Sequence, residues 1–352
     1  MFRTRSLLLL FTLLFLGSYV LQAQRKEEFE VVSIGFYNLE NLYDFHDDPN
    51  TFDDDRAPSG KDRWTQDLYQ KKLNNMAYAI SEIGKEFTGR PPDILGVCEI
   101  ENLQVLEDLV KNPFLKPYNY GIVHFDSPDR RGIDVALLYR REIFSPKQVS
   151  RHELVLFEPK EPTKRSFTRD QLLVSGSMAG DQVHFLINHW PSRSGGEKLS
   201  SHRRENAAKL NRKIVDSLNR IDPYARIMIM GDFNDDPHNT SLTKILGVKS
   251  RKEQLLLKDL YNPYANLARR GAGSLAYRDQ WNLFDQIILS TPLVEKDPSK
   301  FSFFKAYIFN EPFLTTPTGQ YKGYPFRSFG STGFTGGYSD HFPVYVLLIK
   351  KK

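Results

Sequence analysis

The sequence predicts a mixed-sheet α/β sandwich, and three observations lead to that prediction. Short apolar runs rich in β-branched and aromatic residues recur along the chain, as is typical of buried strands. Between them lie segments with apolar residues three and four positions apart, which indicate amphipathic helices. The chain has 352 residues, 40% of them hydrophobic and 26% charged, so it can bury a large core. Disordered and fibrous proteins are therefore excluded.

The strands are expected in chain order along the apolar runs. The segment 172–188 turns back around Ser177–Asp181, which indicates a hairpin and antiparallel pairing. Strands and helices alternate through the middle of the chain, which favours parallel pairs there and a mixed sheet. The expected strands are Val31–Tyr37, Ile94–Cys98, Gly121–Phe125, Val135–Tyr139, Leu172–Ser175, Val183–Asn188, Ile227–Met230, Phe284–Leu289 and Phe342–Ile349.

Two helices are expected between these strands, and two other segments break the pattern. Thr65 is the expected N-cap of the first helix. The repeating apolar positions are Leu73, Met76, Ile80 and Ile83 in the first helix, and Ala207, Leu210, Ile214 and Leu218 in the second. Asp47–Asp62 carries six aspartates and reads as a surface loop, with calcium binding as the alternative. Thr315–Gly337 is rich in Gly, Ser, Thr and aromatic residues and predicts a flexible loop beside a site.

Residues 1–23 read as a secretory signal peptide. Arg3 and Arg5 precede the apolar run Leu7–Leu16, and Ala23 offers a cleavage point. We therefore expect residues 24–352 to form one exported domain, periplasmic or extracellular, without stable membrane insertion once the signal is removed; an uncleaved anchor is the alternative. The single cysteine, Cys98, excludes an internal disulfide.

The charge balance is weakly basic. The chain has 48 Lys and Arg against 43 Asp and Glu, a net charge of +5, of which the signal segment contributes two. Such a balance neither demands nor excludes a nucleic-acid partner, because a local basic groove matters more than the sum.

Polar residues gather where the apolar runs end. The segments are Asn38-Leu39-Glu40-Asn41, Glu99-Ile100-Glu101-Asn102, Asn188-His189-Trp190-Pro191-Ser192-Arg193, Gly231-Asp232-Phe233-Asn234, Asp285 and Asp340-His341. A buried strand delivers such side chains onto the rim of a sheet. Carboxylates, carboxamides and imidazoles without a thiol or serine nucleophile motif suit a divalent cation and a phosphate substrate.

Phosphodiester hydrolysis needs a metal, a group that orients or deprotonates water, and donors for the phosphate oxygens. The residues available are Glu99 and Asp340 for the metal, Asp232 or the Asp285–His341 pair for the water, and Asn234, His189 and Arg193 for the phosphate. Taken singly, each also fits a structural role, such as an Asx turn at Asp232. Their joint occurrence at strand ends favours a catalytic site.

The ordered motifs resemble the endonuclease/exonuclease/phosphatase superfamily, the deoxyribonuclease-I-like fold, over about residues 31–348. The motifs are Asn38-Leu39-Glu40-Asn41, Cys98-Glu99, Arg131-Gly132-Ile133-Asp134, Asn188-His189-Trp190-Pro191-Ser192-Arg193, Gly231-Asp232-Phe233-Asn234, Asp285-Gln286-Ile287-Ile288 and Ser339-Asp340-His341-Phe342. The resemblance implies a four-layer α/β sandwich with two mixed β-sheets flanked by helices.

The resemblance also implies residue roles. Asn38, Glu99 and Asp340 are the implied metal ligands, with Glu99 the principal ligand of Mg²⁺ or Mn²⁺. Asp232 and Asn234 are expected to orient water and hold the phosphate, and Asp285 to hold His341. His189 is expected to protonate the leaving oxygen, and Arg193 and Arg131 to contact phosphate. His189 stands where deoxyribonucleases and sphingomyelinases carry a histidine and abasic-site repair members a tyrosine. That difference, like export, argues against a dedicated DNA-repair enzyme.

The favoured function is a secreted or periplasmic nuclease that uses Mg²⁺-assisted in-line attack by water, with nucleic acid as substrate and no obligate protein partner. One alternative is a phosphodiesterase or phosphatase acting on a phospholipid, as in sphingomyelinases, or on an inositol phosphate. No apolar hairpin stands out in the sequence, and Gln286 replaces the basic residue expected after Asp285 in an inositol-phosphatase motif. A non-catalytic binding module is disfavoured because every core polar position is filled.

Overall fold

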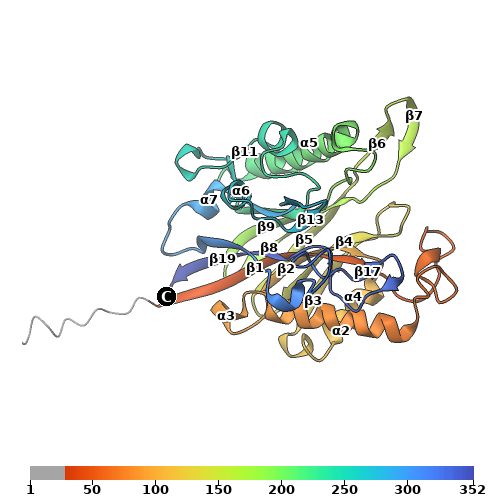
Figure 1. The fold of residues 1–352 in the computed structure, drawn as a ribbon. Coiled ribbons are helices and arrows are strands. Elements are labelled where there is room, and N and C mark those ends of the chain that lie inside the picture. The colour runs from red at the N-terminus through yellow and green to blue at the C-terminus, as the bar shows by residue number, and fades with distance from the viewer. Residues whose placement is uncertain (1–27) are drawn as a thin grey trace, which may run out of the picture.

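Two large β-sheets pack face to face, and helices cover their outer faces (Figure 1). This computed structural model describes residues 28–352, so the expected signal peptide at residues 1–23 lies outside the described residues. The four-layer sandwich predicted from the sequence is confirmed. Across residues 28–352, no helix combines the length and the apolar character that crossing a membrane requires.

The first sheet has six strands in the order β16-β19-β1-β2-β4-β3. The central strand β1 pairs in parallel with β2 and antiparallel with β19, so the sheet is mixed. Phe29, the first residue of β1, pairs with Lys351 of β19, and this pairing places the two ends of the described chain side by side (Figure 1). The strands are β1 (Phe29–Leu42), β2 (Ile94–Ile100), β3 (Tyr120–His124), β4 (Asp134–Arg140), β16 (Ser302–Ile308) and β19 (Val344–Lys351).

The second sheet has seven strands in the order β11-β12-β15-β10-β9-β8-β5. Its central strand β10 is parallel to β9 and antiparallel to β15, and β8 and β9 form the expected hairpin. The strands are β5 (Phe144–His152), β8 (Gln171–Met178), β9 (Asp181–His189), β10 (Ile227–Asp232), β11 (Val248–Lys249), β12 (Leu260–Tyr261) and β15 (Asp285–Ser290).

Helices α2 and α4 cover the first sheet, and α5 covers the second (Figure 1). The α-helices are α2 (Gln66–Glu82), α3 (Lys85–Thr88), α4 (Leu103–Lys111), α5 (Glu197–Ile221), α6 (Ala265–Arg269) and α7 (Thr291–Val294). Short helical turns are η1 (Asp54–Arg56), η2 (Lys116–Tyr118), η3 (Ser241–Leu246), η4 (Lys252–Gln254) and η5 (Pro312–Leu314). Three short strand pairs lie outside the sheets: β6 (Leu156–Glu158) with β7 (Glu161–Ser166), β13 (Leu275–Tyr277) with β14 (Gln280–Asn282), and β17 (Phe329–Gly330) with β18 (Gly333–Phe334).

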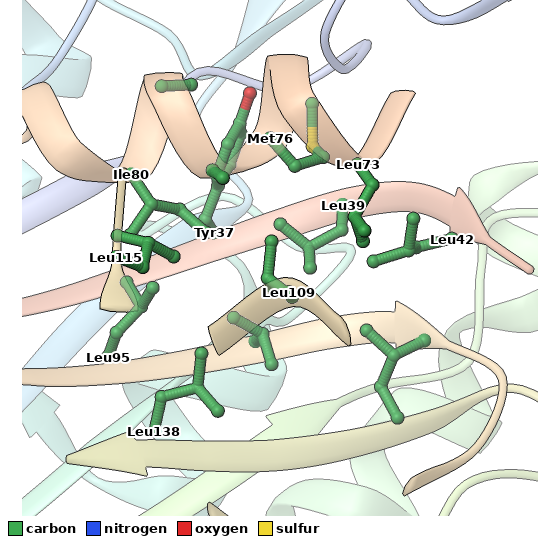
Figure 2. Packing of buried hydrophobic residues seen from close by; sticks show 14 of the residues in the cluster. Tyr37, Leu39, Leu42, Leu73, Met76, Ile80, Leu95, Leu109, Leu115 and Leu138 are labelled. Carbon is green, nitrogen blue, oxygen red and sulfur yellow. The ribbon is translucent and has the colours of Figure 1, made fainter. Parts of the chain in front are cut away.

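Strand β1 carries apolar residues on both faces because it is covered on both. Ile34 and Phe36 enter the core between the sheets, whereas Tyr37 and Leu39 pack beneath α2. Figure 2 shows Met76 of α2 in the same cluster as Tyr37 and Leu39. Burying each such side chain contributes about 2 kcal/mol, so the position of the strand ends is firmly fixed.

The sequence missed elements at sheet edges. Strands β5 and β16 consist mostly of half-buried and exposed residues, so they lack the continuous apolar run that reveals a central strand. Two expectations need correction: β19 begins at Val344 rather than Phe342, and Thr65 takes the N-cap position of α2 without a side-chain capping bond. Asp47–Asp62 forms a loop that contains η1.

Candidate active site

Three neighbouring strands of the second sheet place acidic and imidazole side chains in one row. In the strand register, Asp232 pairs with His189 on one side and with Asp285 on the other. The glycine before Asp232 has a packing reason, because a Cβ on Gly231 would lie 2.4 Å from the carbonyl oxygen of Asn188. The Gly-Asp-Phe-Asn motif therefore brings β10 close against β9 just before the catalytic row.

His341 reaches this row from the segment before β19. Its Nδ1 atom lies 2.6 Å from Asp285 Oδ2, which also accepts a 2.5 Å hydrogen bond from Ser274 Oγ. The other ring nitrogen, Nε2, is 3.9 Å from Asp232 Oδ2. A carboxylate on one nitrogen fixes both the orientation and the tautomer of a histidine. Asp285 thus directs His341 Nε2 toward Asp232.

The pKa values of Asp232 and His341 are both raised above their ordinary values. Burial raises the pKa of Asp232 to about 7, with Asp285 adding to the rise and His341 opposing it. Burial by itself would lower the pKa of His341, but the Asp285 and Asp232 carboxylates outweigh it and raise the pKa well above the usual value. Near neutral pH, His341 keeps its proton while Asp232 exchanges one.

Asn38 and Glu99 come from the first sheet. Asn38 Nδ2 donates a 3.1 Å hydrogen bond to Asp232 Oδ2, which joins the two sheets at the site. Glu99 has a left-handed backbone, with φ of 57°, an uncommon conformation for a glutamate. Its Oε2 accepts the backbone N–H of Asn41 at 3.0 Å, and its Oε1 lies 3.7 Å from His189 Nε2.

These residues fit a divalent cation. Ligand atoms of Asp232, Asp285 and His341 lie within 4.8 Å of one another, and Glu99 lies on the other side of His189. Two buried atoms in this group, Asp285 Oδ1 and His189 Nδ1, have no hydrogen-bond partner among residues 28–352. Carboxylate and amide oxygens are what Mg²⁺ and Mn²⁺ prefer, so the oxygens of Asn38 and Glu99 suit such an ion.

His189 is buried between Glu99 and Asp232, with Nε2 3.7 Å from a carboxylate oxygen of each. Burial lowers the pKa of His189 well below its usual value, and the nearby Arg169 and Arg131 lower it further. The ring is therefore neutral at physiological pH. This charge state disfavours the expected transfer of a proton from His189 to a leaving oxygen.

Asn234 and Arg193 support the segment after β10. The backbone N–H of Asn234 donates to Asp232 Oδ1 at 2.9 Å, and its side-chain Nδ2 donates to the carbonyl oxygen of Trp190 at 3.0 Å. The Arg193 guanidinium binds protein acceptors, namely the Asn234 carbonyl oxygen and the carboxylates of Glu197, Asp235 and Asp236. Arg193 is thus occupied with the protein rather than free for the phosphate contact expected of it.

Arg131 and Asp340 lie at the exposed rim. The Arg131 side chain is 45% exposed, and its Nε lies 3.7 Å from Asp129 Oδ1. Burial opposes its charge, but Glu99 and Asp129 outweigh this and raise its pKa. Asp340 is 39% exposed and lies 3.4 Å from Arg327. Arg131 is therefore available for phosphate, and metal ligation by Asp340 stays a prediction.

Sequence reasoning missed a buried pair beneath the site. Lys72 Nζ donates to the carbonyl oxygen of Glu40 at 2.8 Å and to Ser328 Oγ at 2.6 Å, and the Glu40 carboxylate accepts the backbone N–H of Ser328. Burial raises the pKa of Glu40 and lowers that of Lys72, each to about 8. The pair fastens the segment before Asp340 to the end of β1. The sequence did offer a signal for this pair, because Lys72 lies among the apolar positions of α2, where a charged side chain is buried and needs polar partners.

The comparison with known proteins agrees with this geometry. The model of the Endonuclease/Exonuclease/phosphatase family matches residues 33–350. This chain belongs to the endonuclease/exonuclease/phosphatase family. Members of the family hydrolyse phosphoester bonds, so the chain is a hydrolase of that class and the resemblance found in the sequence is confirmed. Among curated proteins, no sequence matches.

Solved structures of the endonuclease/exonuclease/phosphatase fold are similar over most of the chain. A humanized D. rerio TDP2 with 14 mutations has 14% identity and a TM-score of 0.54, covering 90% of this chain and 98% of its own. A family protein from Bacteroides thetaiotaomicron has 17% identity and a TM-score of 0.53, covering 92% and 100%. The mannosyl-6-phosphatase of that organism has 18% identity and a TM-score of 0.52, covering 90% and 99%. At these identities the likeness shows the fold alone.

Proposed function

We propose that this protein is a metal-dependent phosphodiesterase that cleaves nucleic acid after export from the cytoplasm. The supporting observation is the continuous chain of contacts from Asp285 through His341 and Asp232 to Asn38, with Glu99 beside it. Such a chain combines a proton acceptor, an oriented proton donor and oxygen ligands within one partly buried centre.

Different residues of the site would bind the metal, accept a proton from water and contact the phosphate. Asn38, Glu99 and Asp340 would hold the cation, which supplies charge neutralisation at the phosphate when it is bound. Asp232 accepts a proton from the attacking water, as its pKa of about 7 allows. His341 directs its Nε2 proton to a non-bridging oxygen while Asp285 holds the ring. Attack by the water oxygen on phosphorus then breaks the opposite ester bond, and the departing oxygen takes up a proton from solvent water.

A row of aromatic rings beside His341 favours a substrate that carries flat rings. Phe342 and Trp281 are stacked, with centroids 6.0 Å apart and planes at 13°, and Trp281 is 39% exposed. The row continues through Tyr324 at 5.8 Å to Tyr321 at 5.6 Å. Stacking on such rings contributes about 1–3 kcal/mol per base. Bases are therefore favoured over a lipid or inositol headgroup.

A phosphorylated sugar is the second candidate substrate. The same exposed face of Trp281 can pack against a sugar ring, and one protein of similar fold is a mannosyl-6-phosphatase. This alternative requires a phosphate monoester in place of a diester. Both candidates use the same catalytic row and differ in the type of phosphate ester and in the group bound beside His341.

A substrate panel tests the proposal. The purified protein is incubated with Mg²⁺ and single-stranded DNA, double-stranded DNA, RNA, sphingomyelin, inositol phosphates or mannose 6-phosphate. His341→Ala, purified in parallel, controls for contaminating nucleases. We expect a nucleic acid to give the highest kcat/KM, by at least about 100-fold, a difference of about 3 kcal/mol. A higher value for sphingomyelin or mannose 6-phosphate would overturn the nuclease assignment.

Export is tested separately. We expect the protein isolated from the periplasm or medium of its cells to begin at Gln24. Recovery only from the cytoplasm, with an intact N-terminus, would contradict export.

A further inference from the structure

A groove of about 610 Å³ lies between the β6–β7 hairpin and the first turns of α5. Figure 1 shows this hairpin extending beyond the body of the protein beside α5. The volume is in the range of ligand sites, which is about 300–1,000 Å³. None of the catalytic residues described above lines the groove, so the catalytic chemistry does not explain it.

The lining of the groove is cationic. Five basic side chains, Arg130, Lys160, Lys164, Arg165 and Arg203, face two carboxylates, Glu158 and Glu161. Among the described residues, Arg130 and Lys160 have no ion-pair partner. The Nε atoms of Arg165 and Arg203 are buried and find no acceptor within the described part of the chain. Unmatched donors of this kind favour an anionic ligand.

The groove also adjoins the active site. Arg130 precedes the rim residue Arg131, and Asp129 accepts hydrogen bonds both from Arg131 N at 2.9 Å and from Arg169 at 3.1 Å. Phe167, another lining residue, lies two positions before Arg169 and is 43% exposed, with the Arg165 guanidinium 4.7 Å from its ring centre. The segments that carry Arg131 and Arg169 therefore also form one wall of the groove.

We propose that this groove binds the sugar-phosphate backbone of a single-stranded nucleic acid beyond the phosphate that is cleaved. The inference rests on the proposed nuclease function and names its substrate more closely. Single-strand binding sites combine a cationic groove with exposed aromatic rings, as the lysines and Phe167 do here. Within β6 and β7, Phe157 is the one large apolar side chain that is exposed, among charged neighbours, which disfavours a lipid surface.

A charge-reversal experiment tests the groove apart from catalysis. Lys160→Glu/Lys164→Glu changes two exposed side chains that are not part of the catalytic row, and Lys296→Glu/Lys300→Glu makes the same change of net charge outside the groove. Each full-length variant is titrated with a fluorescein-labelled single-stranded 20-mer DNA in EDTA, and fluorescence anisotropy gives Kd over a range of salt. Hydrolysis of bis(p-nitrophenyl) phosphate with Mg²⁺ is measured in parallel, since this small diester has no further sugar-phosphate backbone for the groove to bind.

We expect Lys160→Glu/Lys164→Glu to raise Kd at least tenfold and to reduce the slope of log K against log salt by about 1.4, or 0.7 per lost charge. The control variant should change Kd less than threefold, and hydrolysis of the small diester should be unchanged in both. Equal weakening in the two variants, or none, would overturn the proposal. So would binding to phosphatidylglycerol vesicles, lost in the groove variant, without binding to the 20-mer.

The failure of the groove proposal is distinguishable from failure of the proposed function. If the protein cleaves DNA but both variants bind it equally well, the proposed nuclease function stands and the groove proposal is wrong. If the protein binds the 20-mer through Lys160 and Lys164 but hydrolyses only mannose 6-phosphate, the groove binds single-stranded nucleic acid and the proposed nuclease function is wrong.

Discussion

His341 Nδ1 lies 2.6 Å from Asp285 Oδ2, and this contact joins the start of β15 in one sheet to the segment before β19 in the other. A second contact, from Asn38 to Asp232, crosses between the same sheets at 3.1 Å. The active centre therefore forms only when the two sheets are packed together. We therefore expect catalysis to depend on the integrity of the core between the sheets.

Replacing His341 or its partner should remove most activity. His341→Ala should lower kcat/KM at least 100-fold, about 3 kcal/mol of transition-state stabilisation. In Asp285→Asn the histidine loses the carboxylate that raises its pKa. This variant should therefore be most impaired at high pH and recover part of its kcat toward pH 6, where His341 regains a proton. A kcat profile parallel to that of the wild type would show that Asp285 does not control the protonation of His341.

Asp232 should make the metal-free protein less stable as pH rises. Its folded pKa of about 7 lies above the ordinary value of 3.8. Its contribution to stability is therefore complete below about pH 4 and is lost as pH rises through 7, because ionisation in the buried site is unfavourable. Urea titrations in EDTA should show Asp232→Asn gaining about 4 kcal/mol relative to the wild type between pH 4 and pH 8. A constant difference would contradict the raised pKa.

Lys72 and Glu40 should behave as a coupled pair. Lys72→Met removes the buried donor to the Glu40 carbonyl oxygen and to Ser328 Oγ, and one of the two cations beside the Glu40 carboxylate, so it should lower the free energy of unfolding by about 3 kcal/mol. Lys72→Met/Glu40→Gln should recover part of that loss, because neither charge remains. Thermal denaturation of the four proteins in a double-mutant cycle measures the coupling. Additive effects of the two substitutions would rule out the pairing.

Gly231→Ala should damage both stability and activity. The added methyl would lie 2.4 Å from the Asn188 carbonyl oxygen, so β10 must move away from β9. We expect a loss of about 2 kcal/mol in the free energy of unfolding, together with lower kcat because Asp232 is the next residue. Chemical denaturation and kcat measured on the same sample provide the test. Wild-type values of both would mean that the strands separate here without cost.

The sequence predicted the site best where buried strands end. Asp232 and Asp285 flank continuous apolar runs, so strand pairing alone brings them together. The state of Arg193 was not predictable in the same way. Two of its carboxylate partners, Asp235 and Asp236, lie more than forty residues later in the chain, and composition does not reveal whether an arginine faces such partners or a substrate. Pairing of Glu40 and Lys72 depends on a contact across 32 residues between a strand end and a helix. No local pattern encodes that contact.

Dependence on a metal held by Glu99 is the central claim, and one titration tests it most directly. Hydrolysis of bis(p-nitrophenyl) phosphate by the wild type and Glu99→Gln is followed as Mg²⁺ is added to EDTA-treated protein. We expect no activity before the metal is added, saturable recovery in the wild type, and at least 100-fold lower turnover in Glu99→Gln at every Mg²⁺ concentration. Full wild-type activity in EDTA, or a Glu99→Gln curve that overlays that of the wild type, would contradict that claim.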